Sequence, residues 1–221
     1  MRKNTEMSNM KKDFVELSKE WFNKQAPVYD DTNTILYSKY GKRSCENIFE
    51  FLKEKEYKKL LDIGCGTGYL IDMLAKDHEA EFIGLDLSPE MIKQANNKNI
   101  KNAKFVEGRS DEIPFEDNTF NIVTCSQSFH HYPDTDKAMQ EARRVLKPGG
   151  LYIFSDTGVG PFKILGVKID DFIYRHFSNT GDCNVSYMEK TIRDMERNGF
   201  MIVKAEKITT FIYTVIGKKI Q

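Results

Sequence analysis

The spacing of apolar residues changes along the chain, from a helical repeat to an alternation of strand and helix patterns. Residues 13–25 place Phe14, Leu17 and Trp21 on one helical face, and Pro27 ends this repeat. A second helical repeat covers residues 39–55. The pattern therefore predicts two helices at the start of the chain, and we expect residues 1–55 to form a helical cap.

From residue 59 onward, short apolar runs of strand length alternate with helical repeats. The expected strands are 59–63, 81–86, 103–107, 120–125 and 151–155, and the expected helices between them are 68–76, 89–97 and 134–146. This alternation is typical of βαβ units around a mainly parallel sheet. After a helix at 186–198, the adjacent runs 200–206 and 208–216 predict an antiparallel hairpin at one sheet edge. We expect a single α/β domain over residues 1–221.

The turn after the first predicted strand is the most informative chemical signal. Residues 60–68 read Leu-Leu-Asp-Ile-Gly-Cys-Gly-Thr-Gly, with glycine at every second position: Gly64, Gly66 and Gly68. Such a strand–turn–helix unit lets backbone approach a ligand closely and aims helix N–H groups at its polar end. The dinucleotide fingerprint spaces its glycines G-x-G-x-x-G. Tyr69 occupies the third of those places here, which disfavours a nicotinamide dehydrogenase.

The turn resembles motif I of the class I S-adenosylmethionine (SAM) dependent methyltransferases. Residues 26–31 are similar to the A-x-x-Y-D segment of the subgroup that includes the ubiquinone and menaquinone C-methyltransferases (methyltransferase type 11). Residues 107–120 resemble the G-D-A-x-x-L-P-F … D-x-S-F-D segment of the same subgroup. The resemblance implies a Rossmann-like, doubly wound sheet of seven mostly parallel strands, with an antiparallel C-terminal strand and N-terminal helices.

The resemblance also implies SAM as cofactor, S-adenosylhomocysteine as its product, and a set of residues around them. Asp86 ends the second predicted strand, where a carboxylate can accept both ribose hydroxyls; capping of the following helix is the alternative. Leu87 and Met91 are expected beside the adenine, and core packing is the alternative for Met91. Tyr29 is expected over the methionine end of the cofactor, unless it is an ordinary core or surface tyrosine. The other candidate cofactor contacts are Asp62, Gly64, Cys65, Gly66, Gly68, Arg109, Ser110 and Ser126.

Arg109 stands where the family commonly has an acid that binds the adenine amino group. A guanidinium has no acceptor for that group, although it can stack on the ring. Adenine recognition is then expected to move to the Ser110 backbone or to Asp111. The arginine at this position also leaves open the alternative of a SAM-binding protein or enzyme with a non-methylating outcome.

Two adjacent histidines, His130 and His131, follow the fourth predicted strand. The carboxyl end of a central strand is where a parallel sheet presents its ligands. Either histidine could act as general base for an acidic O–H, N–H or C–H acceptor. The alternative is that they shape the loop and cap the helix that starts at Asp134.

Composition and charge narrow the class of partner that the protein is expected to bind. Apolar residues make up 40% and charged residues 30%, and Lys+Arg and Asp+Glu are equal at 33. This balance is typical of globular proteins and disfavours nucleic acid as the main partner. The N-terminus is polar, and no apolar run reaches the roughly 18 residues of a membrane helix, so a cytoplasmic location without a membrane span is expected. The oligomeric state is left open.

Cysteines and apolar residues complete the chemical inventory. The four cysteines form no C-x-x-C pair, so no metal is expected: Cys45, Cys65, Cys125 and Cys183. Residues 157–185 are rich in apolar side chains and could form a lid over a small organic acceptor, although burial of a helix face gives the same pattern. We expect methyl transfer to a small-molecule acceptor by in-line displacement, because an activated sulfonium methyl needs mainly orientation and exclusion of water.

Overall fold

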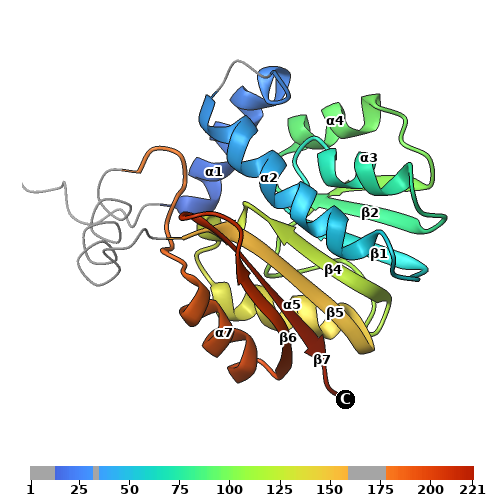
Figure 1. Cartoon of the computed structure of the whole chain (residues 1–221). Coiled ribbons are helices and arrows are strands. Elements are labelled where there is room, and N and C mark those ends of the chain that lie inside the picture. The colour runs from blue at the N-terminus through green and yellow to red at the C-terminus, as the bar shows by residue number, and fades with distance from the viewer. Residues whose placement is uncertain (1–12, 32–34, 159–177) are drawn as a thin grey trace, which may run out of the picture.

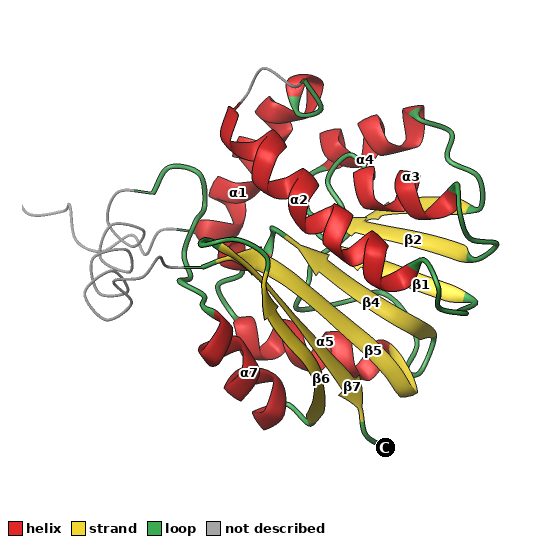
Figure 2. Ribbon diagram, in the orientation of Figure 1, coloured by secondary structure: helices red, strands yellow, loops and turns green. Residues whose placement is uncertain are grey.

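The computed structural model of the chain describes residues 13–31, 35–158 and 178–221. These residues form one sheet with helices on both faces (Figure 1; Figure 2). The strands are β1 (Lys59–Ile63), β2 (Glu81–Asp86), β3 (Ala103–Glu107), β4 (Phe120–Ser126), β5 (Leu146–Thr157), β6 (Phe200–Lys207) and β7 (Ile212–Lys219). The helices are α1 (Phe14–Gln25), α2 (Ile35–Leu52), α3 (Tyr69–Ala75), α4 (Pro89–Asn97), α5 (Thr135–Val145) and α7 (Met188–Arg197), with short 3₁₀ turns η1 (Ala26–Val28) and η2 (Phe129–His131).

The sheet has seven strands in the order β3-β2-β1-β4-β5-β7-β6. The pairs from β3 to β5 are parallel, whereas β7 runs antiparallel to both β5 and β6. This confirms the predicted Rossmann-like, doubly wound architecture with its antiparallel C-terminal strand. The chain order reverses between β1 and β4, and open α/β sheets bind ligands at the carboxyl ends of strands at such a point.

Two apolar cores explain why the central strands are apolar on both faces. On one face the sheet packs against α5 and α7 through residues such as Met139, Val145 and Met195. On the other face it packs against α2, α3 and α4 through residues such as Ile48, Leu70 and Ile92. Because β1, β2 and β4 are covered on both sides, only their ends are open to a ligand.

Some element boundaries differ from those predicted. Helix α2 covers 35–52 rather than 39–55, and β5 begins at Leu146 because that residue pairs with Phe120 of β4. The hairpin turn is also wider than predicted, since the Ile208 and Thr209 N–H groups donate to Ile212 O and β7 starts only there. Hydrophobic alternation continues through such a turn, so it cannot locate the strand ends.

Most of the predicted lid, residues 159–177, lies outside the described residues. Within the described part of the chain, no helix is both long enough and apolar enough to cross a membrane. The N-terminal helices of the predicted cap are present as α1, η1 and α2. Asp13 caps the N-terminus of helix α1, since its side chain accepts from the N–H groups of Val15 and Glu16 at 3.1 and 3.2 Å.

Candidate active site

A pocket opens at the carboxyl ends of β1, β2 and β4, under the N-terminal helices. It is lined by nearly all the residues that the sequence suggested: Tyr29, Asp62, Gly64, Cys65, Gly66, Asp86, Leu87, Met91, Arg109, Ser110, Ser126 and His131. Gly68 and His130 are not among the lining residues. The structure thus brings together side chains from the N-terminal segment and from the ends of several strands.

The three glycines of the turn all have left-handed backbone, but for different reasons. Their φ angles are 71° at Gly64, 53° at Gly66 and 78° at Gly68. A Cβ on Gly64 would lie 2.3 Å from the Ser128 hydroxyl oxygen, and one on Gly68 would lie 2.8 Å from the Phe105 ring. A Cβ on Gly66 would meet only the Tyr29 ring, at 3.7 Å. Packing therefore requires glycine at the two outer positions, whereas a Cβ on Gly66 would make only an ordinary van der Waals contact with the Tyr29 ring.

Asp86 connects the glycine turn to the start of α4. One carboxylate oxygen accepts from the Gly66 N–H at 2.8 Å, and the other accepts from the Ser88 N–H at 2.9 Å. Burial raises the pKa of Asp86, and the backbone N–H donors partly offset that rise. The capping oxygen of α4 comes from the Ser88 hydroxyl, which accepts from the Met91 N–H at 3.1 Å. A carboxylate has about four lone-pair sites, and the N–H groups of Gly66, Ser88 and Leu87 do not fill them all.

Asp62 is a second carboxylate in the pocket, on β1. It is only 2% exposed, and one of its oxygens accepts from the Thr124 hydroxyl at 2.7 Å. Burial raises the pKa of Asp62 to about 7, against the lowering effect of the Thr124 bond and with a further rise from Asp86. A cationic group in the pocket would stabilise the ionised form of this carboxyl.

Arg109 is held by Asp111 in a bidentate ion pair, with N···O distances of 2.8 and 2.7 Å. The guanidinium lowers the pKa of Asp111, so this acid is ionised at the pocket wall. An acid is therefore present close to where the family has one, although two residues further along the chain. This is one of the two alternatives that the sequence left open at this position.

The N-terminal segment is attached to the glycine turn from above. The Asp30 carboxylate accepts from the Thr67 hydroxyl at 2.6 Å and pairs with the Lys98 ammonium at 2.7 Å. Asn23 of α1 accepts from the Ser88 hydroxyl at 2.7 Å. These contacts place the Tyr29 ring across the pocket from Gly66.

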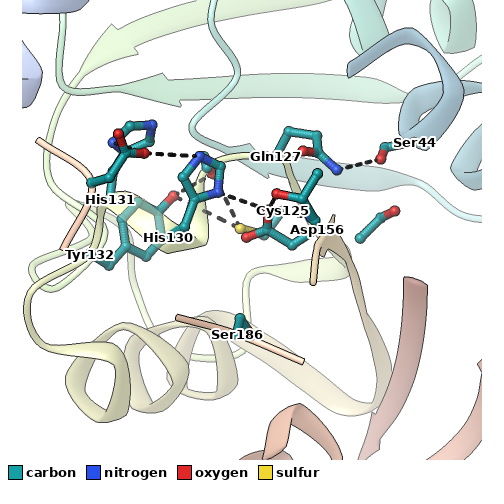
Figure 3. Close-up of polar contacts among 12 residues, drawn as sticks. Ser44, Cys125, Gln127, His130, His131, Tyr132, Asp156 and Ser186 are labelled. Carbon is teal, nitrogen blue, oxygen red and sulfur yellow. Dashed lines mark hydrogen bonds and ion pairs between the residues drawn. The ribbon is translucent and has the colours of Figure 1, made fainter. Parts of the chain in front are cut away.

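The two histidines of η2 have different surroundings. His131 lines the pocket and lies edge-on to Phe22, with ring centroids 4.9 Å apart. His130 instead directs its Nδ1 to the Asp156 carboxylate at 2.8 Å. Figure 3 shows the His130 ring between His131 and Asp156. Asp182 lies near both rings, 3.7 Å from His130 Nε2 and 3.7 Å from His131 Nδ1.

These surroundings shift the two pKa values in opposite directions. Burial lowers the pKa of the His130 ring, but the Asp156 and Asp182 carboxylates outweigh it and raise the pKa to about 9. Burial and the neighbouring His130 charge lower the pKa of His131 well below its usual value. Of the two, only His131 combines a place in the pocket wall with a neutral ring.

Several residues of the site were missed by the sequence reasoning. Gln127 has a left-handed backbone (φ 53°), and its side-chain amide donates to the Ser44 hydroxyl of α2 at 2.7 Å (Figure 3). The Ser128 hydroxyl contacts the Ile63 carbonyl at 3.2 Å, beside Gly64. Gln127 and Ser128 follow directly after Ser126, so their place in the chain was a usable signal. Ser44, Asp156 and Asp182 gave none, because only the fold brings them near.

Comparison with known proteins agrees with this geometry. Residues 61–154 match the family model described as a methyltransferase domain. The demethylmenaquinone methyltransferase of Staphylococcus carnosus is 35% identical over 133 residues, which are 58% of this chain and 55% of that protein. The same enzyme of Chlorobaculum tepidum is 35% identical over 58% of this chain and 54% of its own length. The chain thus spans about half the length of the curated relatives it matches.

Solved structures share the fold. Geranyl diphosphate methyltransferase in complex with GPP and sinefungin has a TM-score of 0.77 at 16% identity, over 95% of this chain and 99% of that chain. The phosphoethanolamine N-methyltransferase 2 of Haemonchus contortus, in complex with SAM, has a TM-score of 0.76 at 18% identity, over 95% of this chain and 60% of that chain. The family match contains the glycine turn and Asp86. Residues 61–154, which make up less than half of the chain, are therefore similar to the methyltransferase domain family.

Proposed function

We propose that the chain binds SAM in this pocket and transfers its methyl group to a small-molecule acceptor. The observation that carries the proposal is the hydrogen bond from the Gly66 N–H to the Asp86 carboxylate. This bond holds a carboxylate that can accept from a ligand beside the glycine turn, at the point where the strand order reverses. The methyltransferase family of residues 61–154 supports the same reading.

The residues present fit the three parts of SAM. The Asp86 oxygens would accept from the ribose hydroxyls, and the buried Asp62 carboxyl would bind the methionine ammonium. Leu87 and Met91 offer an apolar wall for the adenine, and Asp111 offers an acceptor for its amino group. Gly66 carries no side chain, so a cofactor can approach the backbone of the turn beside Tyr29.

When bound, SAM supplies an electrophilic methyl group on a sulfonium centre. The chain has to orient the acceptor for in-line attack and to exclude water. Phe22, Tyr29 and His131 form part of the cover that would do this. We assign the acceptor to the side of the pocket at His131, whose buried ring forms part of the pocket wall.

The relatives named for demethylmenaquinone and the fold neighbours named for phosphoethanolamine and geranyl diphosphate differ widely in acceptor. They support a small molecule as the class of acceptor for this chain. The alternative of SAM binding without methyl transfer rested on Arg109. Arg109 pairs with Asp111 and brings an acid to the pocket, so the arginine at this position does not by itself argue for that alternative.

Calorimetric titration of the purified protein with SAM, S-adenosylhomocysteine and NAD tests the proposal. We expect micromolar binding of the first two and none of NAD. Asp86→Ala should weaken binding by about 1–3 kcal/mol, because it removes hydrogen bonds to a charged group. Asp72→Ala is the matched control, since this residue of α3 only pairs with Lys76 at the surface. Equal affinity of the two variants would remove Asp86 from the cofactor site.

A further inference from the structure

His130, His131 and Asp182 form a cluster of metal-ligating groups at the edge of the pocket. One ligand atom from each residue lies within 4.8 Å of the other two. Asp182 Oδ1 is 3.7 Å from His130 Nε2 and 3.7 Å from His131 Nδ1. Neither 3.7 Å separation is short enough for a hydrogen bond, although each is within ion-pair distance when the imidazole is protonated.

These separations are close to those of ligands around one metal ion. With metal–ligand bonds of about 2.0–2.2 Å, two ligands of a tetrahedral zinc ion lie about 3.3–3.6 Å apart. The two distances of 3.7 Å need only a small contraction to reach this geometry. Two imidazoles and one carboxylate are also a donor set that suits zinc-like divalent ions.

His131 supplies an independent observation. Its side chain is only 6% exposed, and its Nδ1 is buried without a hydrogen-bond partner among the described residues. A buried nitrogen of this kind costs free energy unless something satisfies it. A metal ion between His131 and Asp182 would do so.

Asp156 supplies the support that such a site requires. It is fully buried, and its contact with His130 Nδ1 orients the ring so that Nε2 faces Asp182. A carboxylate that holds the far nitrogen of a ligating histidine is the usual arrangement in protein metal sites.

We propose that His130 Nε2, His131 Nδ1 and the Asp182 carboxylate bind one divalent ion of the zinc class, with Asp156 as a positioning residue. Three protein ligands leave a coordination position for water or for an atom of an acceptor. With the ion bound, His131 Nδ1 is a ligand and does not serve as a base. The site does not depend on the proposed cofactor, because none of its ligands is assigned to SAM.

The test uses the full chain, stripped of metal with a chelator. Co²⁺ is titrated by visible absorption and Zn²⁺ by calorimetry. We expect one ion per chain, with a Kd that is micromolar or tighter. Asp182→Asn should weaken binding at least tenfold, and so should His131→Gln. Asp77→Asn is the matched control, since Asp77 lies 3.6 Å from His78 in another His–Asp pair.

Asp156→Asn tests the positioning role. We expect it to keep one ion per chain, to weaken binding about tenfold and to shift the Co²⁺ absorption band, which a purely structural role would leave in place. Binding of S-adenosylhomocysteine to each variant reports that the pocket is folded, independently of the metal. The proposal is overturned if the wild-type chain binds no ion saturably, or if Asp182→Asn and His131→Gln bind as tightly as Asp77→Asn.

Discussion

At the scale of single residues, equivalent glycines of one turn serve different purposes. Gly64 and Gly68 must be glycine because a Cβ at either position would clash with Ser128 or Phe105 and disturb the packing of the turn. Gly66 has an unobstructed Cβ direction, so only the ligand space and its left-handed backbone require a glycine. A repeat that looks uniform in the sequence therefore contains two positions that packing requires to be glycine and one, Gly66, that we propose lies against the cofactor.

Gly66→Val should abolish SAM binding while the protein stays folded, because the added side chain would fill the space that SAM needs. Gly149→Val is a matched control, since Gly149 also has positive φ (78°) and its nearest contact is again 3.7 Å away. Both variants should lose about 1–2 kcal/mol of stability from the left-handed backbone. Calorimetry would contradict the assignment if both variants bound SAM alike.

The affinity for SAM should rise with pH between pH 6 and 7.5, because the ionised form of Asp62 binds the methionine ammonium. With the pKa of Asp62 raised to about 7, the free protein holds a proton there that SAM must displace. The affinity is therefore expected to fall by nearly tenfold for each pH unit well below 7. Asp62→Asn should bind weakly with a flat profile. A wild-type profile as flat as that of the variant would refute the role.

The stability of the ligand-free protein should fall as pH rises towards 7, whereas the affinity for SAM should rise. The folded pKa of Asp62 lies above its unfolded value of about 3.9, so this group contributes stability that is present at low pH and lost as pH rises towards 7. Thermal unfolding without ligand, compared between wild type and Asp62→Asn, separates this effect from that on binding.

At the scale of elements, the cover of the pocket depends on a few polar contacts to the sheet. Asp30→Ala removes both the Thr67 bond and the Lys98 pair, so the N-terminal segment should close less firmly. We expect S-adenosylhomocysteine to bind about three- to tenfold more weakly, since one charge-assisted bond contributes about 1 kcal/mol. Lys19→Ala breaks only the surface pair with Glu107 and should have little effect. Stopped-flow dissociation rates would check both.

The segment that presents Asp111 is held by α5. Arg144 donates to the carbonyls of Ile113 and Phe115 at 2.8 and 2.7 Å, and Glu141 accepts from the Ile113 N–H at 2.8 Å. Arg144→Ala should lower stability by about 2–4 kcal/mol, because Glu141 then loses its partner in a nearly buried place. Arg197→Ala, which removes the ion pairs of an exposed arginine with Asp136 and Asp194, should lower stability less. Urea unfolding measures the loss of stability in both variants. Equal losses would contradict the role assigned to Arg144.

At the scale of the whole molecule, the pocket is a product of topology. Strands β1 and β4 are neighbours in the sheet although β2 and β3 lie between them in the sequence. Their carboxyl ends therefore bring Asp62 and Ser126 into one pocket, while β2 contributes Asp86. The N-terminal helices cover it, so segments from distant parts of the chain line one pocket.

The sequence by itself determined the sheet, its antiparallel end and most of the pocket wall. Local periodicity records which face of each element is buried, and the glycine turn with Asp86 is a local pattern that predicts its own geometry. The same pattern indicated either the Ser110 backbone or Asp111 as a substitute for the acid that Arg109 replaces. The ends of the strands were predicted less accurately, because the hydrophobic alternation continues into turns such as 208–211.

Only the tertiary structure decided which histidine faces the pocket and what surrounds the other. Asp156 and Asp182 reach His130 from β5 and from the segment before α7, and no spacing in the chain relates these positions. Burial then sets the two pKa values in opposite directions, since it depends on contacts made across the whole fold. Proximity between residues far apart in sequence is a property of packing, and a linear pattern does not carry it.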